Sequence, residues 1–227
     1  MKIISWNCNL KFKQKFDLIS SCDPDICFIQ ECERLKSDFF PNYKYFWTGR
    51  NENKGLGVLT KKNDFFVDES HNKELINFLP IRSDDLKLLG VWSFNHRASK
   101  FGTEVSGNTI DAINFYKDWF GDNDERCIVA GDFNNSIIWD KKGNDNNFNN
   151  INDHFVDLGF VSNYHKLNDE GFGKESYATF FHTKKESKKY HIDYIYSKNL
   201  NPLELKVGSY TDWISYSDHS PLIAELG

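Results

Sequence analysis

Five short polar clusters adjoin apolar, strand-like runs, and they contain the residues best suited to chemistry. The clusters are residues 6–9 (WNCN), 29–31 (IQE), 131–134 (GDFN), 191–194 (HIDY) and 217–219 (SDH). Four of them supply a carboxylate, and a carboxylate is costly to bury unless it is paired or bound to a cation. Carboxylate, amide and imidazole groups gathered at one edge of a core suit metal-assisted hydrolysis of a phosphate ester.

The candidate metal ligands are Glu31 and Asp218, with the amide oxygen of Asn9 as a further ligand. Mg²⁺ commonly takes only one or two protein carboxylates and completes its shell with water and substrate phosphate. Mn²⁺ is an alternative for the same oxygen ligands. We therefore expect a divalent cation at these residues, where it would neutralise charge developing on the phosphate.

The remaining clusters supply candidate catalytic groups. Asp132 is the candidate base for a water molecule, and Asn134 lies two residues later, where it would orient that water or a phosphate oxygen. His219 is a candidate donor to the phosphoryl group, with Asp193 holding its imidazole in the useful tautomer. Asn7 would anchor Asp132 or a phosphate by hydrogen bonding. This set predicts an in-line displacement without a covalent enzyme intermediate.

Each motif also has an ordinary structural interpretation. Taken alone, the GDFN segment could be a turn with side-chain hydrogen bonds, and the SDH segment could be a helix cap or loop. His191 precedes Asp193 by two residues and could touch substrate, but a core role is an equal alternative. The basic run at residues 184–189 is usually a solvated loop, and its place before the Asp193 strand would let it reach a phosphate backbone.

Apolar runs predict the strands that would position these clusters. They lie at residues 2–6, 25–29, 43–48, 55–60, 86–94, 126–130, 177–182, 190–196 and 221–225. Helical spacing occurs three times, in the stripes Phe12/Phe16/Ile19, Ile113/Tyr116/Phe120 (behind a cap at Asn108) and Phe148/Ile151/Phe155/Leu158. Many strands with few helices predict an α/β (α+β) fold in which two packed mixed β-sheets are flanked by helices. We expect one domain over residues 1–227.

In this order, the five clusters resemble the endonuclease/exonuclease/phosphatase superfamily, and its small bacterial members in particular. The superfamily includes deoxyribonuclease I, exonuclease III, abasic-site endonucleases, sphingomyelinases and inositol-phosphate phosphatases. The resemblance spans nearly the whole chain. It implies a four-layer sandwich with two central β-sheets and a magnesium-dependent site at their shared edge.

Two positions depart from the family pattern. Abasic endonucleases carry Asn-x-Asp in the first motif, whereas Asn9 stands here in place of the aspartate and removes a negative charge from the metal site. Relatives usually present a histidine or tyrosine to the scissile phosphate from a middle strand, whereas this chain has Trp92, whose indole cannot act as an acid. Asn95 or His96, just beyond that strand, would then substitute, so the predicted substrate-binding residues are Trp92, Asn95, His96 and His191.

Composition limits the compartment and the partners. The net charge of −5 at pH 7 argues against nonspecific coating of nucleic acid, although a local basic groove is compatible with it. Five scattered cysteines show no metal-site spacing and indicate buried thiols in a reducing compartment. No apolar run is long enough for a membrane span or a signal peptide. We expect a cytoplasmic monomer that does not bind membranes.

The leading functional hypothesis is a magnesium-dependent phosphodiesterase acting on nucleic acid, DNA in the first instance, as an endonuclease or exonuclease. A second hypothesis is a phosphatase or diesterase for a small soluble phosphate ester, which needs no basic groove. A third, from a different class, is a non-catalytic binding scaffold with the same fold. The departures at Asn9 and Trp92 are the features that favour the scaffold.

Overall fold

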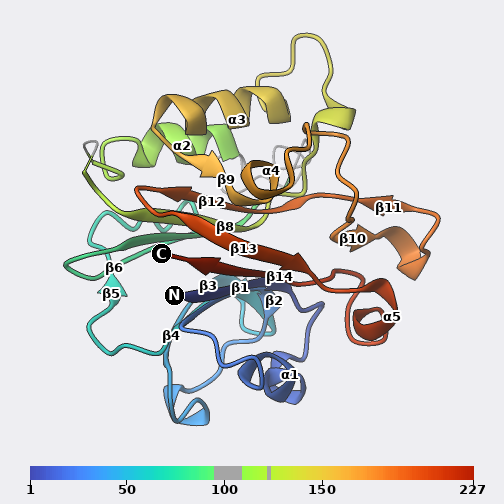
Figure 1. The fold of residues 1–227 in the computed structure, drawn as a ribbon. Coiled ribbons are helices and arrows are strands. Elements are labelled where there is room, and N and C mark those ends of the chain that lie inside the picture. The colour runs from blue at the N-terminus through green and yellow to red at the C-terminus, as the bar shows by residue number, and fades with distance from the viewer. Residues whose placement is uncertain (95–108, 122–123) are drawn as a thin grey trace.

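Two six-stranded sheets pack face to face at the centre of the protein (Figure 1). The computed structural model describes residues 1–94, 109–121 and 124–227. The first sheet has the order β13 (Pro202–Val207), β14 (Leu222–Leu226), β1 (Lys2–Asn7), β2 (Ile26–Cys32), β4 (Lys54–Thr60) and β3 (Lys44–Asn51). The second has the order β5 (Phe66–Val67), β6 (Phe78–Arg82), β7 (Lys87–Trp92), β8 (Cys127–Asp132), β12 (Asp193–Lys198) and β9 (Val161–Ser162). β1 pairs in parallel with β2, and β7 with β8, so both sheets are mixed.

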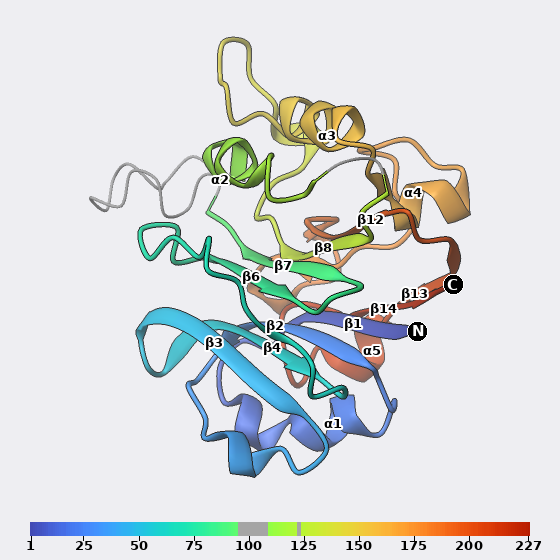
Figure 2. The ribbon, with the colours of Figure 1, turned by 90° about the vertical axis from the view of Figure 1, so that its left-hand side faces the viewer.

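Helices cover the outer faces of both sheets, as Figure 2 shows. α2 (Thr109–Tyr116) and α3 (Phe148–Asp157) pack on the second sheet, and α1 (Phe16–Ser20) packs on the first. The other short elements are α4 (Asn163–Asn168), α5 (Tyr210–Trp213), the ribbon of β10 (Phe180–Phe181) and β11 (Lys189–Tyr190), and 3-10 turns at Phe12–Gln14, Ser37–Phe39, Ile137–Trp139 and His182–Lys184. This arrangement confirms the predicted four-layer sandwich.

The main core lies between the two sheets. The inward side chains of the first sheet, among them Ile3, Phe28 and Val58, meet those of the second, among them Leu88 and Ile128, and all are 2% exposed or less. Burying side chains of this size stabilises a fold by about 1.5–3 kcal/mol each. The packing fixes the two sheets relative to each other, and it therefore fixes the ends of their strands.

Most predicted elements are confirmed, with shifted ends. The stripe at residues 148–158 forms α3, whereas the stripe at residues 12–19 is divided into a 3-10 turn and the short α1. α2 ends at Tyr116, and Phe120 is buried in the turn that follows. The predicted cap Asn108 lies outside the described residues.

Three of the differences from the predicted strands have identifiable reasons. β6 was not predicted, because it contains Pro80 and a proline argues against a strand. The proline is tolerated here because the neighbouring β5 pairs only with Ile81 and Arg82 of β6. β13 was missed because this edge strand is largely solvated. The run predicted at residues 190–196 breaks at residues 191–192, where the chain passes from β11 to β12 and the hydroxyl oxygen of Thr179 accepts hydrogen bonds from the N–H groups of Ile192 and Asp193.

The polar clusters meet at one edge of the paired sheets because of the strand register. Asn7 lies opposite Gln30, while Asp132 lies between Trp92 and Asp193. The two termini mark the opposite edge, and β10, β11 and α5 lie on the side of the clusters (Figure 1). The topology therefore delivers all five motifs to a common edge.

Gly131 is required by the close approach of β8 to β7. A Cβ atom at this position would lie 1.8 Å from the carbonyl oxygen of Val91, and the φ angle is 154°. We expect Gly131→Ala to lower the free energy of unfolding by about 3 kcal/mol or more, because the backbone on which Asp132 sits would have to move. Chemical denaturation measures the loss, and Gly171→Ala, which meets nothing within 4 Å, is the matched control. Equal stability of the two variants would contradict the expected clash.

The other sequence expectations concern thiols and membranes. All five cysteines are free, and four of them are buried. In the described part of the chain, no helix has the length and apolar character needed to cross a membrane.

Candidate active site

Asp132 ends β8 and is fully buried, with hydrogen-bond donors around its carboxylate. Its Oδ2 accepts from Nδ2 of Asn7 at 2.9 Å and from Nδ2 of Asn134 at 3.0 Å. Its Oδ1 accepts from the backbone N–H of Asn134 at 2.8 Å. Donors that fix both oxygens hold the carboxylate in one orientation, in which a buried charge is tolerated.

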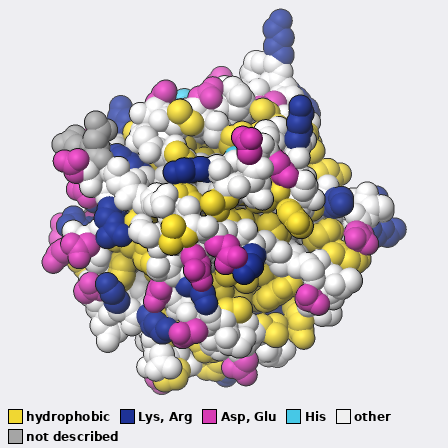
Figure 3. All heavy atoms as spheres, in the orientation of Figure 1, with side chains coloured by type: hydrophobic (Ala, Val, Ile, Leu, Met, Phe, Trp, Pro, Cys, Tyr) yellow, Lys and Arg dark blue, Asp and Glu magenta, His cyan; other side chains and the backbone are white. Residues whose placement is uncertain are grey.

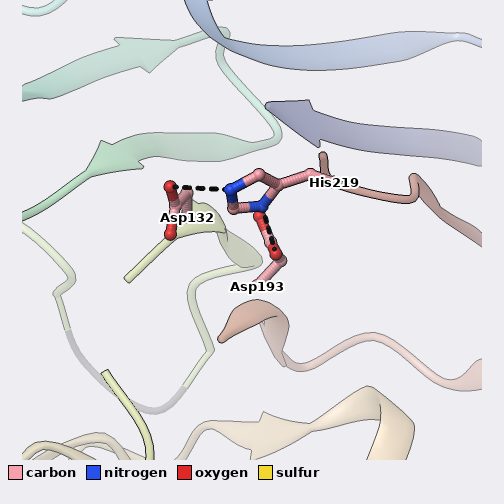
Figure 4. Close-up of side chains that lie close together, drawn as sticks. All are labelled: Asp132, Asp193 and His219. Atoms are coloured by element: carbon pink, nitrogen blue, oxygen red, sulfur yellow. Dashed lines mark hydrogen bonds and ion pairs between the residues drawn. The ribbon is translucent and has the colours of Figure 1, made fainter. Parts of the chain in front are cut away.

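His219 lies between two carboxylates (Figure 4). Its Nδ1 donates to Oδ2 of Asp193 at 2.9 Å, which turns Nε2 toward Asp132. The distance from Nε2 to Oδ2 of Asp132 is 3.9 Å, too long for a hydrogen bond. One oxygen atom, about 2.8 Å from each of these atoms, fits this separation and would hydrogen-bond to both.

Burial and charge shift the pKa of both facing groups upward. Burial, and then the nearby Asp193 carboxylate, raise the pKa of Asp132 above the usual carboxyl range. For His219, burial works against the imidazolium, but the carboxylates of Asp193 and Asp132 outweigh it and raise the pKa. The geometry thus favours an imidazolium donor opposite a carboxyl group that accepts a proton more readily than an ordinary aspartate.

The loop at residues 217–219 is fixed by long-range hydrogen bonds. The Ser217 hydroxyl donates to the carbonyl of Asn7 at 2.7 Å and accepts from the N–H of His219 at 3.0 Å. The Trp6 indole donates to the carbonyl of His219 at 2.9 Å, and the N–H of Phe181 donates to the carbonyl of Asp218 at 2.8 Å. β1 and the β10–β11 ribbon therefore hold this loop from two sides.

Asn134 has the left-handed backbone conformation, with φ 46°, that asparagine tolerates. Its Nδ2 donates to the carbonyl of Ser93 at 2.9 Å as well as to Asp132. Asn134 thereby links the end of β7 to the carboxylate at the end of β8. Its amide is committed to holding Asp132 in this structure.

The candidate metal ligands come from the end of β2 and from two loops at the same edge. A β-bulge lies between Gln30 and Cys32, and Glu31 within it has φ 59° and a side chain that is 20% exposed. The N–H of Leu10, next to Asn9, donates to the Glu31 carbonyl at 3.1 Å. Nδ2 of Asn9 donates to Oδ1 of Asp218 at 3.0 Å, so the segments bearing the three candidate ligands are neighbours.

These residues fit a hard divalent cation, because two carboxylates and one amide supply only oxygen ligands. A second group of ligand atoms, from Asp132, Asp193 and His219, lies within 4.8 Å of one another. In that group the oxygens of Asp132 and Nδ1 of His219 already have hydrogen-bond partners. The carboxylates of Glu31 and Asp218 also have partners, but they are only partly buried, so a cation can reach them and they stay the predicted metal ligands.

The predicted substrate-binding residues have different surroundings. His191 is 4% exposed, donates from Nδ1 to the Tyr177 carbonyl at 2.8 Å and packs on Tyr164, which is the environment of a structural histidine. Trp92 lies opposite Asp132 in the register and is 6% exposed. Asn95 and His96 lie outside the described residues. A substrate contact by any of the four stays a prediction.

Two side chains near the site were missed in the sequence. Nζ of Lys54, at the start of β4, lies 2.9 Å from Oε2 of Glu31. The ring of Phe180 lies over the imidazole of His219, with 4.6 Å between ring centroids. The sequence around Lys54 and Phe180 does not indicate a place at the site, because both contacts join segments that are far apart in the chain.

Comparisons with known proteins show solved structures of similar fold and a matching protein family. A comparison with curated protein sequences found no match. Among solved structures, the 3′ phosphatase NExo from Neisseria, bound to a product DNA hairpin, has a TM-score of 0.74 at 18% identity over 100% of this chain and 99% of that chain. The 3′-5′ exonuclease NExo from Neisseria meningitidis has a TM-score of 0.74 at 19% identity over 99% of both chains.

An AP endonuclease from Archaeoglobus fulgidus is similar in fold as well, with a TM-score of 0.73 at 14% identity over 99% of this chain and 98% of that chain. At these identities the likeness concerns the fold. The family model described as the endonuclease/exonuclease/phosphatase family matches residues 4–219, which carry all five polar clusters. The chain therefore belongs to the endonuclease/exonuclease/phosphatase family.

Proposed function

We propose that the protein is a magnesium-dependent phosphodiesterase that hydrolyses DNA by in-line attack of water on phosphorus. The observation that carries this proposal is the pair of facing groups, Nε2 of His219 and Oδ2 of Asp132, at 3.9 Å. A hydrogen-bond donor opposite an acceptor at this separation suits an oxygen that loses a proton on one side while a phosphoryl group is stabilised on the other.

Asp132 is the proposed general base. Its raised pKa brings its proton affinity closer to that needed for taking a proton from water near neutral pH. Asn7 and Asn134 hold the carboxylate through their amide groups, so its position is set before substrate arrives. The water oxygen forms the new bond to phosphorus as its proton passes to Asp132, and the ester bond opposite it breaks.

His219 is the proposed donor to a phosphate oxygen. Asp193 accepts from Nδ1, so the protonated imidazole keeps its Nε2–H for the substrate. Negative charge on the phosphoryl oxygens then meets a fixed donor within a buried site, where such hydrogen bonds are strongest. No covalent intermediate is needed.

Glu31, Asp218 and Asn9 would hold Mg²⁺, and Mn²⁺ suits the same ligands. When bound, the cation neutralises negative charge on the phosphate and the leaving oxygen. The ligand segments themselves are fixed by the bulge at Glu31 and by the hydrogen bond between Asn9 and Asp218.

Glu31→Gln should raise the magnesium concentration for half-maximal activity by about tenfold or more, because one of two anionic ligands becomes neutral. A magnesium titration of hydrolysis rate measures the shift. Glu204→Gln removes an exposed carboxylate that pairs with Lys206 on β13 and should leave the titration unchanged. An unchanged titration for Glu31→Gln would remove this residue from the metal site.

Aromatic side chains beside His219 support a nucleic-acid substrate. Phe180 contacts the His219 ring, and Tyr190 lies 6.3 Å from Phe180 and 5.0 Å from Trp139 between ring centroids. These rings are partly exposed and could stack on bases or sugars. The turn between β10 and β11 adds the exposed lysines Lys184, Lys185 and Lys188, and the exposed Lys189 follows as the first residue of β11. Rings with cations beside a hydrolytic site suit a polyanion with stacking bases.

A pocket with mostly basic charged side chains lies between the turn at Phe12–Gln14 and the segment that follows β2. Lys13, Arg34 and Lys36 line it, with Asp38 as the acidic member, and Arg34 also pairs with Glu52 at 3.3 Å. On the face shown in Figure 3, by contrast, Lys and Arg side chains alternate with Asp and Glu. Positive charge is therefore local, which fits the net charge of −5 and a contact with a few phosphates.

The structural neighbours support the same substrate, because their descriptions name a 3′ phosphatase with a product DNA hairpin, a 3′-5′ exonuclease and an AP endonuclease. A panel of substrates tests the proposal: end-labelled duplex DNA, duplex DNA with one abasic site, DNA with a 3′-phosphorylated end and RNA, together with a chromogenic nitrophenyl phosphate. We expect cleavage or trimming of DNA at a higher kcat/KM than of the small ester. Hydrolysis of the small ester alone would contradict a DNA substrate and favour a small-ester phosphatase, which the net negative charge suits.

A further inference from the structure

Lys54 forms an ion pair with Glu31, one of the proposed metal ligands. It is the first residue of β4, and the neighbouring Gly55 pairs with Cys32 just after the bulge. This register points Lys54 at the bulge, and its Nζ lies 2.9 Å from Oε2 of Glu31. The lysine is 42% and the glutamate 20% exposed at the side chain, so the ion pair is half-buried.

The two neighbouring ligands add only one carboxylate, that of Asp218. Asn9 is neutral, and its amide donates to Oδ1 of Asp218 at 3.0 Å. The ammonium of Lys15 donates to the carbonyls of Asn9 and Tyr216, at 3.3 and 2.7 Å, on the two segments that carry Asn9 and Asp218. Donors of the protein therefore already contact one oxygen of Glu31 and one oxygen of Asp218, and a lysine holds the segments that carry Asn9 and Asp218.

Trp92 is the second side chain that contacts the Lys54 ammonium. Nζ of Lys54 lies 5.4 Å from the centroid of the Trp92 ring, within the range of a cation–π contact. An indole gives the strongest attraction of this kind among the aromatic side chains. The two unusual residues, Asn9 and Trp92, thus have a shared consequence: both favour an ammonium at Glu31 over a divalent cation.

We infer that Lys54 is a built-in competitor for the divalent cation, held on Glu31 by Trp92, and that metal binding requires its ammonium to leave Glu31. This inference rests on the proposed metal site. Lys54 would thereby lower the affinity of the site for the metal, so that the site binds the cation more weakly than its oxygen ligands alone would allow. Coulomb repulsion between an ammonium and a divalent cation acts in the same direction as competition for the carboxylate.

Metal binding without substrate tests the inference. Mn²⁺ binding to the whole purified protein, followed by isothermal titration and by electron paramagnetic resonance, should be about threefold to tenfold tighter for Lys54→Met than for wild type. Lys54→Arg, which keeps the charge, should stay near wild type. Lys206→Met removes an exposed lysine paired with Glu204 and should have no effect. Unchanged or weaker Mn²⁺ binding by Lys54→Met, or no binding by any of these proteins, would overturn the inference.

A double-mutant cycle with Glu31→Gln separates direct competition from a general charge effect. If Lys54 competes for Glu31, the gain from Lys54→Met should largely disappear in the Glu31→Gln background. An equal gain in both backgrounds would overturn direct competition. These measurements use no substrate, so a protein that fails to hydrolyse DNA can still confirm the role of Lys54. The thermal midpoint of each variant without metal verifies that it is folded, and the shift caused by Mn²⁺ is a further measure of binding.

Discussion

Replacing Asp132 by alanine should lower the rate of DNA hydrolysis by about a thousandfold or more, because the proposed general base is removed and the amides that hold it lose their partner. The carboxylate accepts three hydrogen bonds from Asn7 and Asn134. Asp132→Asn keeps the size of the side chain and should be similarly inactive, since an amide cannot take up the proton. Single-turnover cleavage of a labelled duplex at saturating Mg²⁺ measures both variants.

The pH profile distinguishes a base from a merely structural carboxylate. Burial, and then Asp193, raise the pKa of Asp132 to about 7. A base acts in its ionised form, so wild-type kcat/KM should be present above this value and should fall as the pH is lowered through it. A flat profile between about pH 5.5 and about pH 8.5 would contradict the role of Asp132 even if the alanine variant were inactive.

His219→Ala should lower turnover by about two to three orders of magnitude, the range seen when a transition-state donor is removed. The imidazole is the group placed between Asp193 and Asp132, and its Nε2–H has no acceptor within hydrogen-bond distance among the described residues. Because the substrate can still be held elsewhere, kcat should fall more than KM rises. Steady-state kinetics on a labelled duplex measures this split.

The variant leaves Asp193 buried without its imidazole, so stability must be followed in parallel. His219→Gln retains an amide donor and provides a second test if the alanine variant is poorly folded. His154→Ala, on the outer helix α3 with its ring bonded to the Asn150 carbonyl, is the matched control and should retain wild-type turnover. Near-normal turnover in a folded His219 variant would contradict its proposed role.

The clustering of the polar motifs could be predicted because it follows from strand geometry. Each motif sits at a strand end, and strands paired in register bring their ends together, as Asp132 and Asp193 do. Helix α3 could be predicted as well, because its apolar residues recur at helical spacing within one short segment. Both predictions use only short-range periodicity together with the rule that strands pack into sheets.

The remaining features depend on contacts that local sequence does not encode. His191 was weighed as a neighbour of the site because it precedes Asp193 by two residues, but the break between β11 and β12 turns its ring against Tyr164. The pairing of Lys54 with Glu31 requires the register of β2 with β4 and a bulge at Glu31. Such pairings are decided by tertiary packing, which a single sequence does not reveal.

Nicking of supercoiled plasmid across a magnesium titration, by wild type and by identically prepared Asp132→Ala, tests the central claim most directly. We expect wild-type protein to nick the plasmid only when Mg²⁺ is present and Asp132→Ala to leave it intact at every magnesium concentration. The identical preparation exposes any contaminating nuclease. Equal nicking by the two proteins, or none by wild type at any magnesium concentration, would contradict a DNA phosphodiesterase that works through Asp132.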